Sequence, residues 1–261
     1  MAFDQDEFIR LLVDFYEFCS RVFWELPVQH APPGGWPSIN HETLAGLQKN
    51  DQAVELLRHL PYPDFDASSV AFTPLIMDHT RVVDYRSEYI HGKIRSSVLE
   101  TKPEPFTDRD PPLTPSCACL ATSAGRNGYF VVVDTEDGYV YWGDPNGRHD
   151  EPEPELNATL ERFNGDPANA WRRRYVGVNV YRPAEFFALC KQRFRELRWI
   201  GCGHWTIFAL RMNSEWGEDE EHEELVEKMR MAGWPGDGEG RGWDRAKFYD
   251  LLQEPDDWEK Q

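Results

Sequence analysis

The sequence lacks the features of disulfide-rich, zinc-binding, membrane-spanning and secreted proteins. Its five cysteines are an odd number with no Cys-x-x-Cys pair, so we expect neither a disulfide framework nor a structural zinc site. No apolar run approaches the ~20 residues that span a bilayer. The acidic start, MAFDQDEFIR, also lacks the basic and apolar regions of a signal peptide. We therefore expect a cytoplasmic protein without a metal or a cofactor.

Positive charge is scarce. The 261 residues include 28 Lys and Arg against 46 Asp and Glu, which gives a formal net charge of −18 at pH 7. Bulk charge of this sign opposes nucleic acids. Hydrophobic residues still make up 40% of the sequence, with ten Trp and fifteen Phe, so the chain is long and apolar enough to bury a core.

Segment 171–199, WRRRYVGVNVYRPAEFFALCKQRFRELRW, is the exception, with eight Lys and Arg residues against two Glu residues. On a helix that begins at Pro183, its later cations would share one face. With the three consecutive arginines they would form a compact positive surface, which would bind and orient a polyanion through its phosphates. The predicted phosphate contacts are Arg172, Arg173, Arg174, Lys191, Arg195 and Arg198. Cationic side chains that only flank an apolar helix stripe are the alternative.

Negative charge gathers in EWGEDEEHEELVEK, residues 215–228. On a helix, carboxylates three or four residues apart would converge on one cation, and a guanidinium is matched best by a fork of carboxylate oxygens. The candidate carboxylates are Asp219, Glu220, Glu223 and Glu224. A solvated helix start is the alternative, because acids complement the dipole there and Glu224 with Lys228 is an ordinary pair.

Hydrophobic periodicity predicts a single α+β domain. The expected parts are residues 1–66, mainly helical, 67–182, mainly strands, and 183–261, mainly helical. Strands and helices in separate blocks favour an antiparallel sheet over the strict alternation of a parallel one. We expect a central hairpin at 128–142, with helices 4–24 and 184–198 packed on one face.

Turn and capping residues place the finer boundaries. Asp137-Gly138 separates two β-branched and aromatic runs and is the dipeptide that best supplies the positive φ angles of a tight hairpin. Asp51 is the expected N-cap of a helix that Pro61 stops. Two further strand candidates are VAFTPLIM, 70–77, and RVVDYRSEYI, 81–90.

Two short motifs suggest catalysis only weakly. GDGEGRG, 236–242, resembles a glycine-rich phosphate loop, but it follows no predicted strand and carries two acids. Cys202 and His204 would face the same side of a strand, although a nucleophile pair also needs a thiolate within hydrogen-bond reach of the imidazole. We favour a histidine at the edge of the core.

Several segments together carry a resemblance that covers most of the chain. They are GGWPSI…ETLAGL…VELLRHLPY, GYFVVVDTEDGYVYWG, PAEFFALCKQRFRELRW and a C-terminal GWP. They resemble a large group of ascomycete proteins that includes the fungal arginine-containing cyclodipeptide synthases. The resemblance implies an enzyme of secondary metabolism that condenses arginine and a second amino acid, both taken from aminoacyl-tRNAs, into a diketopiperazine.

This resemblance implies roles for the charged residues. The family's acidic D-D-x-x-E-type motif has its nearest match in DEEHE, 219–223, which differs at the second position. Asp219, Glu220 and Glu223 are implied as catalytic residues, and Asp219, Glu223 and Glu224 as ligands of the arginyl side chain. The six basic residues would hold the acceptor stem of the tRNA. Neither set lies on a predicted apolar stripe, so we expect the fold to survive their replacement.

The order of elements also resembles the SUKH domains. Their plan of N-terminal helices, an antiparallel meander with a GYFVVVDTEDGYVY-like hairpin and a closing helix is similar to this chain. SUKH domains are non-catalytic binding modules and include immunity proteins that neutralise toxins. This resemblance implies a basic protein partner, which a net charge of −18 suits.

Overall fold

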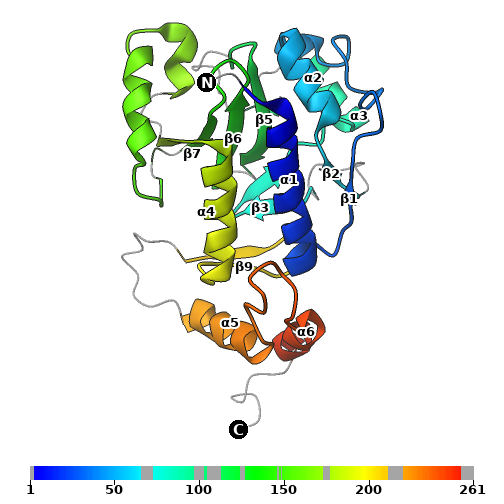
Figure 1. Ribbon diagram of the computed structural model, residues 1–261, viewed down its shortest axis with the longest axis vertical. Coiled ribbons are helices and arrows are strands. Elements are labelled where there is room, and N and C mark those ends of the chain that lie inside the picture. Colours follow the sequence, from blue (N-terminus) through cyan, green and yellow to red (C-terminus); the bar gives the residue numbers. More distant parts are fainter. Residues whose placement is uncertain are drawn as a thin grey trace.

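A six-stranded antiparallel sheet with flanking helices forms the body of the molecule, which confirms the predicted α+β class (Figure 1). The computed structural model describes residues 3–65, 73–96, 103–104, 113–123, 127–145, 147, 149–172, 177–210 and 220–253. The sheet has the order β3-β4-β5-β6-β7-β8. Its strands are β3 (Leu75–Met77), β4 (Thr80–Val82), β5 (Cys117–Ser123), β6 (Phe130–Asp134), β7 (Val140–Gly143) and β8 (Val178–Tyr181).

Two smaller antiparallel sheets and a set of helices complete the chain. The small sheets pair β1 (Val28–Gln29) with β2 (Tyr62–Pro63) and β9 (Trp199–Gly201) with β10 (Ile207–Ala209). The α-helices are α1 (Gln5–Cys19), α2 (Asp51–His59), α3 (Glu88–Arg95), α4 (Pro183–Arg195), α5 (Glu220–Met231) and α6 (Arg245–Gln253). Shorter helical segments are η1 (Ser20–Trp24), η2 (Ala45–Leu47), η5 (Glu155–Phe163) and η6 (Pro167–Arg172).

The predicted hairpin lies inside the sheet, as β6 and β7. Phe130 pairs with Gly143 and Val133 with Val140, so the strands are in register up to the turn. Gly138 closes that turn with a φ of +78°, a conformation that costs glycine little. Every residue of both strands is buried, because the sheet is covered on both sides.

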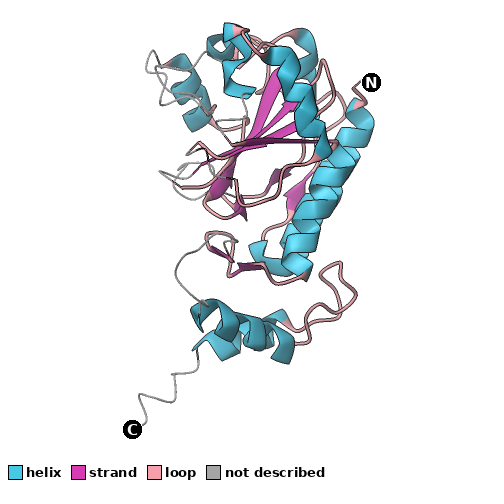
Figure 2. Cartoon of the chain, turned by 90° about the vertical axis from the view of Figure 1, so that its left-hand side faces the viewer, coloured by secondary structure: helices cyan, strands magenta, loops and turns pink. Residues whose placement is uncertain are grey.

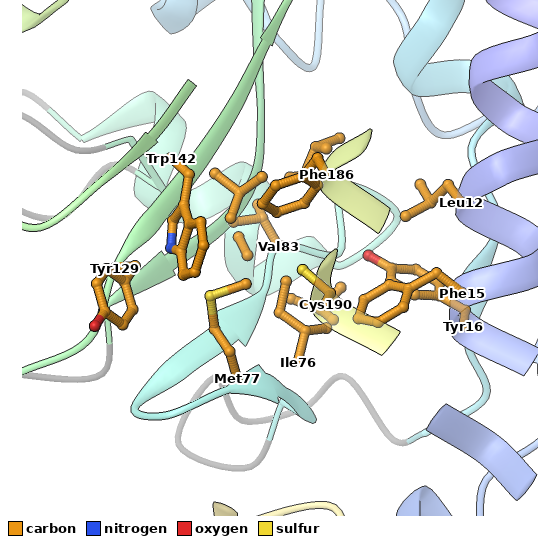
Figure 3. Close-up of a cluster of buried hydrophobic side chains, with 14 of the residues drawn as sticks. Leu12, Phe15, Tyr16, Ile76, Met77, Val83, Tyr129, Trp142, Phe186 and Cys190 are labelled. Carbon is orange, nitrogen blue, oxygen red and sulfur yellow. The ribbon is translucent and has the colours of Figure 1, made fainter. Parts of the chain in front are cut away.

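Helices α1 and α4 lie side by side on one face of the sheet, as predicted (Figures 1 and 2). Phe187 of α4 packs against Phe8 and Phe15 of α1, with ring centroids 5.9 and 5.6 Å apart. Figure 3 shows the core between these layers, where Trp142 of β7 faces Phe186 of α4. Aromatic rings of this size dominate the apolar area that folding buries.

Two local predictions were wrong. The strand expected over 81–90 ends at Val82, and helix α3 begins at Glu88 because the Ser87 hydroxyl accepts a hydrogen bond from the Tyr89 amide at 3.2 Å. Asp51 is not the N-cap of α2. Asn50 has that role, since its side chain accepts from the amide of Ala53 at 2.9 Å.

The C-terminal helices α5 and α6 lie together at one end of the sheet body (Figures 1 and 2). The loop between them reaches back to η1, where Arg21 donates to the main-chain oxygen of Glu239 at 2.8 Å, and to α4. None of the helices that the structure describes combines the length and apolarity needed to cross a membrane.

Candidate functional site

The basic segment 171–199 does not form an open positive face in the described part of the chain. Arg173 and Arg174 lie outside the described residues. The other six cations each have a carboxylate of this chain within 4.0 Å: Arg172 has Asp134 and Asp137, Arg182 has Glu185, Lys191 has Asp14 and Glu239, Arg193 has Glu151 and Glu196, Arg195 has Glu239, and Arg198 has Glu151. Acids from elsewhere in the sequence therefore lie beside five of the six described cations, and Arg182 pairs with Glu185 of the segment itself.

Arg172 is buried at the turn end of the β6–β7 hairpin, with 2% of its side chain exposed. Its Nη2 donates to Asp134 at 2.6 Å, and its Nη1 lies 3.4 Å from Asp137. Three aromatic rings surround the guanidinium at 4.4 to 4.6 Å: Tyr141, Trp171 and Phe163. This aromatic and acidic cage holds η6 against the hairpin, and Arg172 is closed to a phosphate in this conformation.

Lys191 and Arg195 of α4 are bound by the glycine-rich loop 236–242. The Lys191 ammonium lies 2.8 Å from the Glu239 carboxylate and 2.7 Å from Asp14, and Arg195 donates to Glu239 and, at 2.6 Å, to the carbonyl of Gly238. Burial raises the pKa of Glu239, but the hydrogen bonds and charges of Lys191 and Arg195 lower it by more. The loop therefore binds cations of the same chain.

Gly240 shows why one position of this loop requires a glycine. Gly240 has a φ of +80°, and a Cβ added there would lie 2.9 Å from Val22 and 3.0 Å from the Arg21 side chain. A larger residue would both strain the backbone and push the loop away from η1.

Arg198 does not continue the helical face that was predicted for it. Helix α4 ends at Arg195, and Leu197 takes a φ of +58°, which turns the chain before Arg198. Arg193 instead binds the buried Glu151 through Nε at 2.6 Å, and Arg198 lies 4.0 Å from the same carboxylate. The predicted series of Lys191, Arg195 and Arg198 along one helix face is therefore wrong at its last position.

The tolerance of the fold for changes in the basic set stays a prediction, and burial argues against it at two positions. The side chains of Arg172 and Lys191 are only 2% and 7% exposed, and both have buried or half-buried acid partners. RNA binding by this set stays a prediction that no described contact supports.

The acidic candidates lie on the surface of α5. Glu220, Glu223 and Glu224 are exposed in its first turns, and Asp219 lies outside the described residues. Glu224 pairs with Lys228 one turn later. His222 faces the opposite way, buried, with its Nε2 2.7 Å from the carbonyl oxygen of Leu197. In the described part of the chain these carboxylates do not converge on a cation, and catalysis or arginine binding by them stays a prediction.

Cys202 and His204 lie in the turn between β9 and β10. Burial raises the pKa of Cys202 to about 12, so the thiol is protonated at neutral pH and is a poor nucleophile. His204 packs on Trp205, with ring centroids 4.3 Å apart, and its carbonyl accepts from the amide of Leu75. No cluster of three or more metal-binding side chains occurs among the described residues.

The β9–β10 hairpin presents an apolar surface that the sequence did not indicate. Trp205 and Leu210, on either side of β10, are 53% and 41% exposed. The sequence predicts a strand near Cys202 and His204, but it does not predict that the strand is flanked by exposed apolar residues. The local pattern is a short uncharged strand flanked by two large apolar residues. Whether those two side chains are exposed depends on what the rest of the fold leaves uncovered.

Comparison with family models, with curated proteins and with solved structures found no match for this chain. Functional inference therefore rests on the geometry of its charged and exposed residues.

Proposed function

We propose that this chain is a non-catalytic protein-binding module whose acidic surface binds a basic protein partner. One observation carries the proposal. The six described cations of segment 171–199 all lie beside the chain's own carboxylates, whereas Glu220, Glu221 and Glu223 of α5 face solvent. The charge available to a partner is thus predominantly negative, which favours association with a basic surface.

The order of elements supports this proposal by analogy. N-terminal helices, an antiparallel meander and a closing helix α4 are the plan that the resemblance to SUKH domains implied. Fold alone does not determine function. The analogy gains weight here because a binding module needs no convergent catalytic groups.

The alternative, a tRNA-dependent cyclodipeptide synthase, makes two structural demands. It needs cations free to hold phosphates and carboxylates that converge on an arginyl group. The described residues assemble neither, since Lys191 and Arg195 are bound by Glu239 and the α5 acids point into solvent. The synthase stays a prediction that a direct assay separates from the binding module.

The assay is expression of the full chain in a bacterial host, which supplies every charged tRNA, followed by mass spectrometry of the medium. We expect no diketopiperazine that contains arginine while the protein is soluble and folded. Accumulation of such a compound above the empty-vector level would overturn the binding-module proposal.

A charge-reversal experiment tests the binding module itself. The chain is used to capture and cross-link partners from its source cells, beside a variant with Glu220→Lys, Glu223→Lys and Glu224→Lys. The matched control reverses three exposed acids elsewhere: Glu42, Glu136 and Glu161. We expect a partner richer in Lys and Arg than in acids, lost with the α5 variant and kept with the control. Equal loss from both would indicate unspecific charge attraction.

A further inference from the structure

The C-terminal unit, residues 220–253, has an aromatic core of its own. It consists of α5, α6 and the loop between them, and it lies at one end of the sheet body (Figures 1 and 2). Trp243 packs against Trp234 and Phe248, with ring centroids 5.2 and 6.0 Å apart, and Phe248 packs against Tyr249 at 5.7 Å. Within the described chain, these four rings make ring contacts only with one another. A segment with such a core is able to open locally while the rest of a protein stays folded.

Hydrogen bonds join this unit to the body, and many of their donors are charged. Arg21 of η1 donates to the main-chain oxygen of Glu239 at 2.8 Å. Arg195 of α4 donates to the carbonyl of Gly238 at 2.6 Å and to the side chain of Glu239. The other described bonds of this seam are those of Lys191 with Glu239, Arg245 with Ser20, Trp234 with Arg195, His222 with Leu197 and Gly203 with Tyr249. The attachment of the unit therefore depends strongly on charge.

Glu239 is the centre of this attachment. One oxygen of its carboxylate lies 2.8 Å from the Lys191 ammonium, and the other accepts from Arg195. In the described part of the chain, these are the two ion pairs that join the unit to the body. Charged hydrogen bonds of this kind are stronger than neutral ones. Replacement of this single side chain would therefore remove the strongest contacts of the seam.

The loop that carries Glu239 has internal hydrogen bonds that do not involve the body. The side chain of Asp237 accepts from the amides of Glu239 and Arg241 at 2.8 and 3.0 Å, and from Nε of Arg241 at 2.8 Å. The amide of Asp237 donates in turn to the carbonyl of Arg241 at 2.9 Å. All of these bonds lie within residues 237–241, so separation of the loop from α4 leaves them intact.

Opening of the seam would leave no charge buried without a partner. Lys191 also lies 2.7 Å from Asp14 of α1, so it keeps a carboxylate of the body when Glu239 leaves. The side chains of Arg195 and Glu239 are each 34% exposed and regain water on separation. Separating partly exposed charges costs much less than breaking a fully buried pair. The seam is therefore suited to reversible opening.

We propose that residues 220–253 open from the sheet body as one unit while the sheet stays folded, and that Glu239 is the ionic contact that holds the unit closed. Opening separates Glu239 from Lys191 and Arg195 and keeps the aromatic core of the unit. This inference goes beyond the proposed function and does not depend on it. Because α5 carries the exposed acids Glu220, Glu221 and Glu223, the acidic surface lies on the part of the chain that moves.

Hydrogen exchange of the full chain tests the opening. The amides of α5 and α6 should exchange together and faster than those of β6 and β7. Their exchange should become severalfold faster when sodium chloride is raised from about 0.1 to about 1 M, because the Debye length falls from about 10 to about 3 Å. The amides of β6 and β7 should not respond. Exchange of α5 and α6 at the rate of β6 and β7 under both conditions would show that the chain opens only as a whole, which would refute the proposal.

Matched variants assign the contact to Glu239. Glu239→Gln should accelerate exchange in α5 and α6 about tenfold and leave β6 and β7 unchanged, because it removes charged hydrogen bonds of the seam alone. Glu227→Gln is the control within the unit, since Glu227 is exposed and has no ion-pair partner in the described part of the chain. Asp14→Asn is the control within the body, because it removes the other partner of Lys191. Neither control should accelerate exchange in α5 and α6.

A double-mutant cycle separates a direct contact from general weakening. Arg195→Gln and Glu239→Gln remove the same ion pair, so their combined effect on exchange should be smaller than the product of the single effects. A combined effect equal to that product would show that the two residues act independently and would rule out Glu239 as the ionic contact. Equal acceleration by Glu239→Gln and Glu227→Gln, or by Glu239→Gln in β6 and β7 as well as in α5 and α6, would have the same consequence.

Discussion

The two most highly charged regions of this chain have opposite relations to the fold. The basic segment 171–199 directs its described cations against carboxylates of the same molecule, and Arg172 is buried among three aromatic rings. The acidic start of α5 directs Glu220, Glu221 and Glu223 into solvent. The difference teaches that a run of charge in a sequence does not reveal whether the charge serves the fold or a partner. That depends on which distant residues the topology brings beside it.

Removing the most deeply buried cation should have the largest effect. Arg172→Met leaves Asp134, 4% exposed, without its partner, and we expect a loss of about 3–5 kcal/mol in the free energy of unfolding. Arg182→Met is the matched control, because its pair with Glu185 is half exposed and should contribute less than about 1 kcal/mol. Urea denaturation of both variants measures the difference. Equal, small losses would show that the two cations are equivalent surface charges.

A smaller loss is expected at the contact between α4 and loop 236–242. Lys191→Met removes an ammonium that binds Asp14 and Glu239, at a cost of about 1.5–3 kcal/mol for the charged hydrogen bonds lost. The loss should be below that of Arg172→Met because Asp14 is 51% exposed and regains water. Hydrogen exchange should also become faster in α5 and α6. Unchanged exchange there would show that the loop does not fasten these helices.

His149 should give a pH dependence, since burial lowers its pKa to about 4 and its Nδ1 accepts from the amide of Glu151 at 3.0 Å. The unfolded chain binds this proton near pH 6.5 and the folded chain near pH 4, so stability falls as the pH falls through that interval. The contribution should be about 2 kcal/mol between pH 7 and pH 5. His149→Gln should remove it, which urea denaturation at the two pH values measures. A variant with the same pH slope as the unmodified chain would contradict a neutral, half-buried His149.

The smallest effect on stability should come from the acids of α5. Glu220→Gln with Glu223→Gln removes two exposed charges that have no ion-pair partner in the described part of the chain. We expect a change in melting temperature too small to resolve, while capture of the basic partner is reduced. A clear loss of stability would show that these acids, like the basic residues, serve the fold.

Local patterns in the sequence predicted much of the fold. Apolar residues at helical spacing located α1 and α4, and Asp137-Gly138 located the β6–β7 turn, because each signal depends on neighbours within a few residues. The same logic failed at Glu88–Arg95, where β-branched and aromatic residues upstream favoured a strand. The Ser87 cap was the local signal for that helix.

The electrostatic partners could not be predicted in the same way. Arg172 meets Asp134 across 38 positions, and Lys191 meets Glu239 across 48, so both contacts require the complete topology. Arg198 left its predicted helix face because a single residue, Leu197, adopts a left-handed conformation.

Titration of tRNA onto the full chain at low salt tests the central claim most directly. If the cations of segment 171–199 are committed to the fold, saturable binding should be absent, and Lys191→Glu with Arg195→Glu should leave the titration unchanged wherever the variant is folded. Saturable binding of tRNA, with a salt dependence that falls by nearly one unit of slope for each cation reversed, would contradict the account.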